Sequence, residues 1–243
     1  MMIGLLGKKV GMTQLFDKDG RAIAVTVLRV GPCCVTQIRT ETKDGYTAVQ
    51  LGFEPAKAKH LNKAKVGHLI KSGNTLLRFI REIRTKEIEN LEVGSELRVN
   101  NFEEGDVVDI VGVTIGKGFQ GVVKRHGHKG GEKAHGTKMG REPGSIGSSA
   151  FPSRVIKGLK LPGQMGNVQQ TTQNLKVMKI DADNDLLLVE GSVPGHDGTY
   201  LIIRNALKKG KPKKWKVVKS VSAAARASVS PDEASGSASE ASM

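Results

Sequence analysis

Residues 116–168 read GKGFQGVVKRHGHKGGEKAHGTKMGREPGSIGSSAFPSRVIKGLKLPGQMGNV, and the rest of the chain is best interpreted outward from them. The stretch holds thirteen glycines and ten basic residues, but only two acidic ones, Glu132 and Glu142. A loop of this length inside a compact domain is unusual unless it is functional or disordered. Apolar residues such as Phe119, Ile146 and Phe151 interrupt it, whereas disordered segments are rich in Ser, Glu and Gln. We therefore expect an extended arm that folds against a partner; a floppy surface insertion is the alternative.

The composition of this arm indicates the chemistry of its partner. Glycines allow close backbone approach and leave N–H groups free for phosphates, and Lys and Arg neutralise phosphate charge. As a hairpin of about 25 residues each way, at roughly 3.3 Å per residue, the arm could reach up to ~80 Å. Such reach fits a large folded RNA. Binding through six to ten phosphates would weaken by roughly 10³–10⁵ over a fourfold rise in salt.

Short strands are predicted on both sides of the arm. Alternating apolar residues and turn signals place them at residues 23–28, 35–40, 46–53, 76–83, 96–99, 106–115, 175–180, 186–190 and 200–204. The turns 17–20 and 181–185 each join two strands. A short helix is expected at residues 56–67, ending at Gly67. Many short strands at close spacing predict a mainly β fold, a small barrel or sandwich with little helix.

Charge and composition narrow the class of protein. The 243 residues carry a formal net charge of +14, which favours a polyanionic partner. We find no long apolar run and no basic amphipathic helix, so no membrane partner is expected. The chain has nine aromatic residues, fewer than proteins that read single-stranded bases by stacking usually carry. The sequence shows no signal or transit peptide, which leaves the cytoplasm as the expected location.

The chain offers no convincing catalytic, nucleotide or metal site. Adjacent Cys33 and Cys34 are expected to be small strand residues without a disulfide. Gly116–Gly121 matches the dinucleotide pattern G-x-G-x-x-G, but no βαβ alternation surrounds it, and we expect no stable helix after it. His126, His128 and His135 lack a cysteine nearby and stand among cations, so no metal site is expected. No cofactor, no small-molecule substrate and no enzymatic activity are predicted.

Two segments complete the map. Residues 208–220 form an acid-free basic run around Trp215, for which a second phosphate-contacting arm is favoured over a solvated tail. Residues 221–243 are rich in Ser and Ala with a few acids, and are expected to be a disordered tail. The globular domain is then expected to comprise residues 1–115 and 169–207, with 116–168 inserted in it.

Several blocks of sequence resemble the family of large ribosomal subunit protein three. They are GLLGKKVGMTQLF (4–16), GKGFQG followed by Lys124 and Arg125 (116–125), PGSIG (143–147), LPGQMGN (161–167) and NDLLLVEGSVPG (184–195). The blocks occur in family order over residues 1 to about 210. The chain lacks the extensions of archaeal and eukaryotic cytosolic members, so it resembles the bacterial type.

The resemblance implies a β-barrel of the kind shared by translation factors, with a long extension that threads into large-subunit rRNA. It also implies binding near the 3′ end of that rRNA, a role in early subunit assembly, and neighbouring large-subunit proteins as partners. The arm's tip, expected at Gly144, Ser145, Ile146, Gly147, Ser148, Ser149 and Ala150, would approach the peptidyl transferase centre without being the catalyst. Base-level contacts, the identity of the neighbours and the role of the tail stay open.

The residues expected to bind rRNA are cations, histidines and one glutamine from the opening strand, the arm and the basic run. They are Lys8, Lys9, Lys117, Lys124, Arg125, His126, His128, Lys129, Lys133, His135, Lys138, Arg141, Arg154, Lys157, Lys160, Gln164, Lys208, Lys209 and Lys211.

One departure from the family pattern leads to a further expectation. Bacterial members can carry a methylated glutamine a few residues after G-S-I-G, but Ala150 stands there in this chain. No such methylation is predicted. Two other classes require signatures of their own: an assembly enzyme would need a P-loop or cofactor fold, and a free RNA regulator would need an RRM or KH signature. Neither signature is present.

Overall fold

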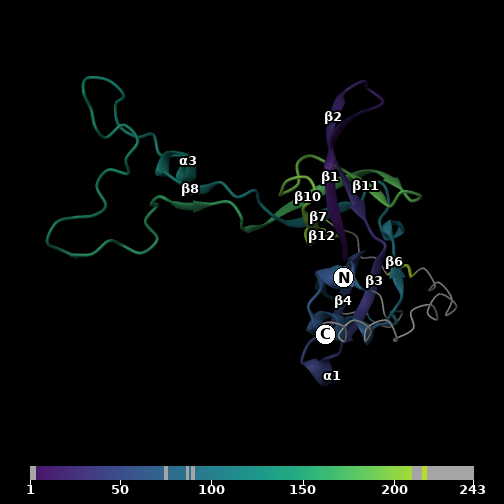
Figure 1. Cartoon of the computed structure of the whole chain (residues 1–243). Helices are drawn as coiled ribbons and strands as arrows, with labels where there is room; N and C mark the ends of the chain where they lie inside the picture. Colours follow the sequence, from purple (N-terminus) through teal and green to yellow (C-terminus); the bar gives the residue numbers. More distant parts are fainter. Residues whose placement is uncertain (1–3, 74–75, 86–87, 89–90, 210–214, 218–243) are drawn as a thin grey trace, which may run out of the picture.

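Six antiparallel strands close into a barrel. The computed structural model describes residues 4–73, 76–85, 88, 91–209 and 215–217; the expected tail 221–243 lies outside them. Around the barrel run β1 (Gly4–Phe16), β12 (Tyr200–Asn205), β7 (Val107–Val113), β10 (Gln169–Asp181), β11 (Leu186–Glu190) and β2 (Ala22–Val30) (Figure 1). The prediction of a mainly β barrel fold with little helix is confirmed. Its likeness to the translation-factor barrel stays a prediction.

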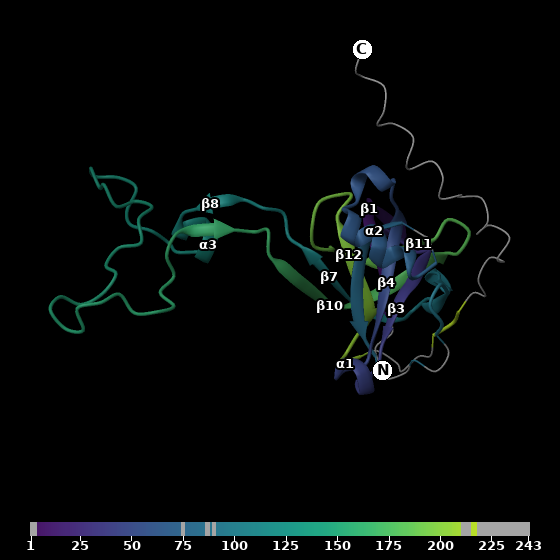
Figure 2. The same cartoon turned by 60° about the horizontal axis from the view of Figure 1, so that its bottom comes forward.

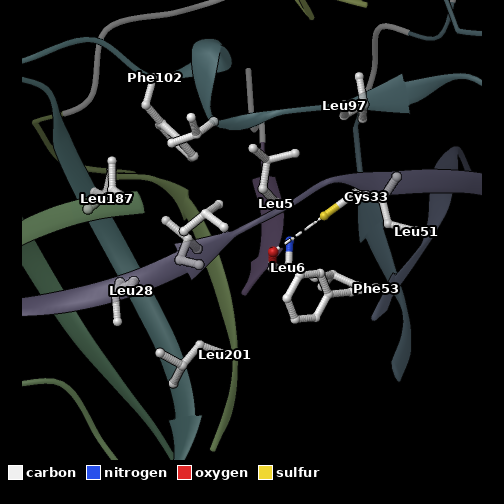
Figure 3. Packing of buried hydrophobic residues seen from close by; sticks show 14 of the residues in the cluster. Leu5, Leu6, Leu28, Cys33, Leu51, Phe53, Leu97, Phe102, Leu187 and Leu201 are labelled. Carbon is white, nitrogen blue, oxygen red and sulfur yellow. Dashed lines mark hydrogen bonds between the residues drawn. The ribbon is translucent and has the colours of Figure 1, made fainter. Parts of the chain in front are cut away.

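A second sheet packs beside the barrel. Its strand order is β5 (Leu77–Arg84), β4 (Ala48–Pro55), β3 (Cys33–Arg39) and β6 (Glu96–Leu97). The first four residues of β1 are buried because β1 contacts both the barrel strands and this sheet. Leu5 and Leu6 of β1 therefore share one apolar cluster with Leu51, Phe53 and Cys33 (Figure 3). The barrel and the sheet have a common core.

The helices are few and short. They are α1 (Glu41–Asp44), α2 (Lys63–Ile70) and α3 (Val122–His126), with single 3₁₀ turns η1 (Ala58–His60) and η2 (Val99–Asn101). The helix expected at 56–67 was wrong in its bounds: α2 begins at Lys63 and continues through Gly67 to Ile70. Leu69 is fully buried, and the Ser72 hydroxyl donates to its carbonyl at 2.7 Å. Tertiary burial thus extends the helix beyond the glycine.

The predicted strand residues and turns are confirmed at the cysteines and at two hairpins. Cys33 and Cys34 lie on β3 and form no disulfide. The turn after β1 is closed by Gly20 N–H donating to Asp17 O at 2.9 Å. In the turn between β10 and β11, the side chain and backbone of Asn184 donate to Asp181 and lower the pKa of its carboxyl.

Candidate RNA-binding surface

The two strands that carry the glycine-rich stretch are paired at the point where it leaves the barrel. Gln169 of β10 lies opposite Val113 of β7. One step further out, Thr114 N–H donates to Val168 O at 3.0 Å and Asn167 N–H to Thr114 O at 3.1 Å. In two views, the stretch beyond this point lies to one side of the barrel (Figures 1 and 2). The barrel ladder therefore sets its direction of departure.

A two-stranded ribbon follows. It pairs β8 (Gly118–Gln120) with β9 (Gly163–Met165), and Lys117 N–H donates to Met165 O at 2.9 Å. Gly166 allows the ribbon to close: its φ is +72°, and a Cβ there would lie 2.0 Å from Ile115 O. Only glycine fits a backbone this close to another. This glycine serves contact within the chain, whereas the sequence analysis assigned such glycines to contact with RNA.

The expectation of no stable helix after Gly121 was wrong. Residues Val122–His126 form α3, which ends at Gly127 with φ +73° and N–H bonds to the carbonyls of Val122 and Val123. Val122 is almost fully buried. The glycine density that argued against a helix instead supplies its C-terminal cap, because glycine accepts the left-handed conformation there.

Arg125 and His126 of α3 contact the segment that leads into β9. Arg125 Nη1 donates to Leu161 O at 2.6 Å, and His126 Nε2 lies 3.1 Å from the same oxygen. Both side chains are half-buried. They hold α3 against the returning segment, so the resemblance-based assignment of these two residues to rRNA receives no support from their contacts.

Beyond α3, residues 129–160 are almost entirely exposed. Gly140 and Pro152 are half-buried, and every other residue of this span is exposed. All seven residues of the expected tip, Gly144 to Ala150, are exposed. The exposed cations of the whole stretch are Lys117, Lys124, Lys129, Lys133, Lys138, Arg141, Arg154, Lys157 and Lys160, and Gln164 is exposed with them. Within the described residues, no ion pair neutralises any of these cations.

The outer part also exposes large apolar side chains among its cations. Phe151 is 88% exposed and Phe119 75%, and Ile156 and Met139 are also open to solvent. Close backbone contacts shape this part: a Cβ on Gly130 would lie 2.2 Å from Gly140 O. Exposed rings and branched chains beside cations are able to contact bases and sugars where the cations contact phosphates.

The three histidines of the stretch do not form a metal site. The rings of His126 and His128 lie 6.0 Å apart and tilted, and His135 stands in a left-handed turn with φ +57°. In the part of the chain that the structure describes, no group of three or more His, Cys, Asp or Glu side chains could hold a metal ion.

Two expected rRNA ligands on β1 have other partners. Lys9 is 8% exposed, and its Nζ donates to Val193 O at 3.2 Å and Gly195 O at 3.0 Å. Lys8 is half-buried, with its Nζ 3.0 Å from Glu54 Oε1. The Lys9 ammonium holds the loop between β11 and β12, and that of Lys8 joins β1 to β4. The sequence could not show this, because their partners are remote in the chain.

The C-terminal basic run also differs from its expected form. Lys208 and Lys209 are exposed, whereas Lys211 lies outside the described residues. Trp215 is only 7% exposed and belongs to the common core. Lys216 N–H donates to Asn101 Oδ1 at 2.7 Å, and Asn101 Nδ2 donates to Lys216 O at 3.1 Å. Residues 215–217 therefore pack on the globular part and do not belong to a separate arm.

The edge strand β5 carries exposed cations that the sequence analysis did not select. Arg78, Arg81 and Arg84 are all exposed. The Arg81 guanidinium stacks 4.7 Å from the Phe79 ring, and that of Arg84 lies 5.2 Å from the Tyr46 ring. The sequence signal for them is an arginine at every third position of LRFIREIR (77–84). The apolar pattern of this segment predicts a strand but does not indicate a cationic surface. Stacked guanidinium groups with fixed planes are suited to phosphate recognition.

Comparison with known proteins gives a consistent result. A family profile described as Ribosomal protein L3 matches residues 82–185. The chain is 48% identical over 208 residues to large ribosomal subunit protein uL3 of Pelobacter propionicus, covering 86% of this chain and all of that protein. Another uL3, from Prochlorococcus marinus strain NATL2A, is 49% identical over 212 residues, with 87% of this chain and 97% of that protein covered.

The similarity extends over both the barrel and the glycine-rich stretch, and the relatives are bacterial. No helix within the described ranges is long and apolar enough to cross a membrane. The predicted resemblance is confirmed: the chain belongs to the ribosomal protein uL3 family, in its bacterial form.

Proposed function

We propose that the protein is a non-enzymatic structural component of the large ribosomal subunit that binds rRNA mainly through residues 116–168. Family membership supports the ribosomal role. The observation that carries the RNA-binding part is the run of exposed, unneutralised cations from Lys117 to Lys160. In a cytoplasmic ribosome, the densely packed phosphates of folded rRNA are the complementary charge.

The globular part and the glycine-rich stretch would have different roles on the rRNA. Residues 1–115 and 169–207 would form the globular domain on rRNA near its 3′ end, where early binding nucleates subunit assembly. Residues 116–168 would extend into the RNA and bring Gly144 to Ala150 toward the peptidyl transferase centre. Paired strands at the base support this by fixing the direction of departure. Lys208 and Lys209 would add contacts beside the barrel, and neighbouring subunit proteins would cover part of its surface.

The RNA-binding set is revised by the contacts. We retain the exposed residues Lys117, Lys124, Lys129, Lys133, Lys138, Arg141, Arg154, Lys157, Lys160 and Gln164, together with His128 and His135. Arg125 and His126 instead hold α3, which carries Lys124 of this set, and Lys8 and Lys9 bond groups within the globular part. The absence of glutamine methylation at Ala150 stays a prediction; a 14-dalton addition mapped to this loop by mass spectrometry would contradict it.

Sedimentation tests the proposal first. Untagged lysate is resolved on a sucrose gradient, and the large subunit is washed in high salt. We expect about one copy per mature subunit, retained through the wash because shape as well as charge holds the protein. Sedimentation as a free protein, or only with immature particles, would replace the structural role with that of an assembly factor.

A charge-matched pair of variants then tests the surface. Lys133, Lys138 and Arg141 are replaced together by alanine, and Lys59, Lys63 and Lys65 in the control, so each variant loses three exposed cations. We expect the first triple to reduce incorporation into subunits and to lower the salt dependence of rRNA binding more than the control does. Equal effects would mean that only net charge matters. Both triples should leave the melting temperature of the free chain unchanged.

A further inference from the structure

The hairpin of β1 and β2 continues past the barrel, and its outer part has an unpaired edge. β1 pairs with β12 from Gly4 to Lys8, and the last bonds on that side are made by Lys9, whose N–H donates to Thr199 O at 3.0 Å and whose carbonyl accepts from Gly198 N–H at 2.7 Å. Pairing with β2 continues to Phe16. The segment from Val10 to Ala24, here called the hairpin end, stands clear of the other barrel strands in Figure 1.

The register shows which backbone groups face this free edge. On the β11 side of β2, Val30 N–H donates to Asp185 O, and Ala24 O accepts from Gly191 N–H. The backbone N–H and C=O groups of the even-numbered residues of β2 therefore point toward β11, and those of the odd-numbered residues point toward β1. Opposite these odd residues, after the bulge between Lys9 and Gly11, lie Gly11, Thr13 and Leu15. The N–H and C=O groups of Met12, Gln14 and Phe16 therefore point to the free side. No strand within the described residues pairs with them.

The side chains at this edge are uncharged and exposed, and apart from the Gln14 amide they are apolar. Met12 is 52% exposed and Phe16 69%, and Ala22 and Ala24 are exposed across the strand pair from Phe16 and Gln14. None of these residues is charged. A long, exposed apolar edge strand is a pairing site that proteins normally blunt with Lys or Pro unless a partner covers it.

The chemistry of this edge selects a polypeptide over RNA. Phosphate oxygens only accept hydrogen bonds, and the 2′-hydroxyl is the one donor that each nucleotide of the RNA backbone offers, so that backbone does not match the alternating N–H and C=O groups of a strand edge. An extended polypeptide offers both donors and acceptors in register. Around the turn, Asp17 and Asp19 balance Lys18 and Arg21, in contrast to the ten cations and two acids of residues 116–168. The hairpin end therefore has no electrostatic attraction for phosphates.

We infer that the hairpin end is a docking edge for an extended, largely apolar segment of a neighbouring protein of the large subunit, which adds as a strand beside Met12–Phe16. The inference rests on the proposed ribosomal function and goes beyond it by specifying the surface and the mode of binding. Main-chain bonds supply the affinity, and the Met12 and Phe16 side chains cover the partner's apolar residues.

Site-specific cross-linking from purified large subunits tests this inference. Phe16 is replaced by the photoreactive p-benzoylphenylalanine, which keeps an aromatic ring, and the cross-linked residues are mapped. We expect one site in a single large-subunit protein. Adding Gln14→Pro, which removes an edge N–H without breaking a bond to β2, should lower the yield at least tenfold. Gln14→Lys should lower it too, since lysine blunts edge pairing, whereas Gln14→Ala should leave it unchanged.

Each other result has a distinct meaning. The inference would be overturned by cross-links to rRNA or to a second copy of this chain. It would also be overturned if subunits that contain the protein gave no cross-link. None of these results would affect the ribosomal role. A yield unaffected by both Gln14→Pro and Gln14→Lys would also overturn it, because the contact would not involve the backbone edge. Failure of the wild-type chain to sediment with the subunit would instead reject the proposed function.

Discussion

Gly166 shows how a single residue shapes the departure of the glycine-rich stretch. It lies where the ribbon approaches the backbone of Ile115 and has a positive φ. The lack of a side chain here is a steric requirement, since both the left-handed conformation and the close carbonyl exclude a Cβ.

Replacing Gly166 by alanine should therefore loosen the base of the ribbon. We expect a local cost of about 1–3 kcal/mol from the left-handed conformation and the displaced backbone, equivalent to roughly 5- to 150-fold faster hydrogen exchange of Lys117 N–H. NMR exchange measures this. Gly121→Ala is the control, because Gly121 has φ −70° and open space around it. Equal exchange rates in the two variants would contradict the assignment.

Cys33 illustrates a buried titratable group. Its thiol donates to Leu6 O at 3.3 Å, and burial raises its pKa from 9.0 to about 12 (Figure 3). The folded state therefore holds this proton at pH values where the unfolded chain releases it. The contribution to stability is complete below pH 9 and is lost as pH rises toward 12.

We expect the free energy of unfolding to fall by about 1.4 kcal/mol per pH unit from this group alone across that window. Urea unfolding between pH 8 and about 11 would compare the wild type with Cys33→Ala, which lacks the group; Cys34→Ala is the control. The slope should be shallower in Cys33→Ala only. A common slope in all three proteins would show that Cys33 titrates normally when folded.

At the scale of elements, Tyr200 joins the barrel to the second sheet. Its hydroxyl donates to Oε2 of Glu54 on β4, and Lys8 of β1 donates to Oε1 of the same carboxylate. The Tyr200 ring stacks on that of Phe79 of β5, with 4.7 Å between the ring centroids. The bond from Tyr200, followed by that from Lys8, lowers the pKa of Glu54. Burial, followed by the same bond, raises the pKa of Tyr200 to about 12. The polar contacts thus connect three strands, and the ring stacking adds β5.

Tyr200→Phe keeps the stacking and removes the hydrogen bond. We expect a loss of about 1–2 kcal/mol in the free energy of unfolding, since the bond is made to a charged, half-buried acceptor. Tyr46→Phe is the matched control: its hydroxyl also bonds a carboxylate, that of Glu82 at 2.8 Å, but at an exposed site. The control should lose no more than about 0.5 kcal/mol. Similar losses in guanidinium unfolding would argue against a special role for Tyr200.

For the whole molecule, the chain's C-terminal part completes the core. Trp215 packs in the cluster shared by barrel and sheet, and its neighbour Lys216 bonds Asn101 through its backbone. The globular unit therefore continues past residue 207, where the sequence analysis ended it.

Trp215→Ala should consequently destabilise the globular part by about 3–5 kcal/mol, because it leaves a large cavity in a shared core. Lys216→Ala is the control, since its exposed ion pair with Glu103 contributes little. Denaturant unfolding followed by circular dichroism measures both. A small effect of Trp215→Ala would indicate that residues 215–217 dissociate from the core in solution.

Local patterns in the sequence were sufficient for much of this protein. Alternating apolar residues predicted the strands from Ile23 onward, the Asp-rich turns 17–20 and 181–185 predicted the hairpins, and glycine with lysine and arginine marked residues 116–168. These signals are local because strand alternation, turn conformation and charge density depend on neighbouring residues. The family blocks identified the family, since specific short motifs in fixed order survive without knowledge of the fold.

Only the tertiary structure determined which Lys and Arg side chains are exposed to solvent and available to bind a partner. Lys9 and Val193 are 184 positions apart, and Arg125 and Leu161 are 36 apart, yet these contacts remove both cations from the exposed set. Tertiary structure also buries Trp215 within a basic run of sequence. It likewise forms α3 in a glycine-rich segment, where Gly127 caps the helix. Charge is a property of the residue, but its availability depends on packing against distant segments, and only the fold brings those together.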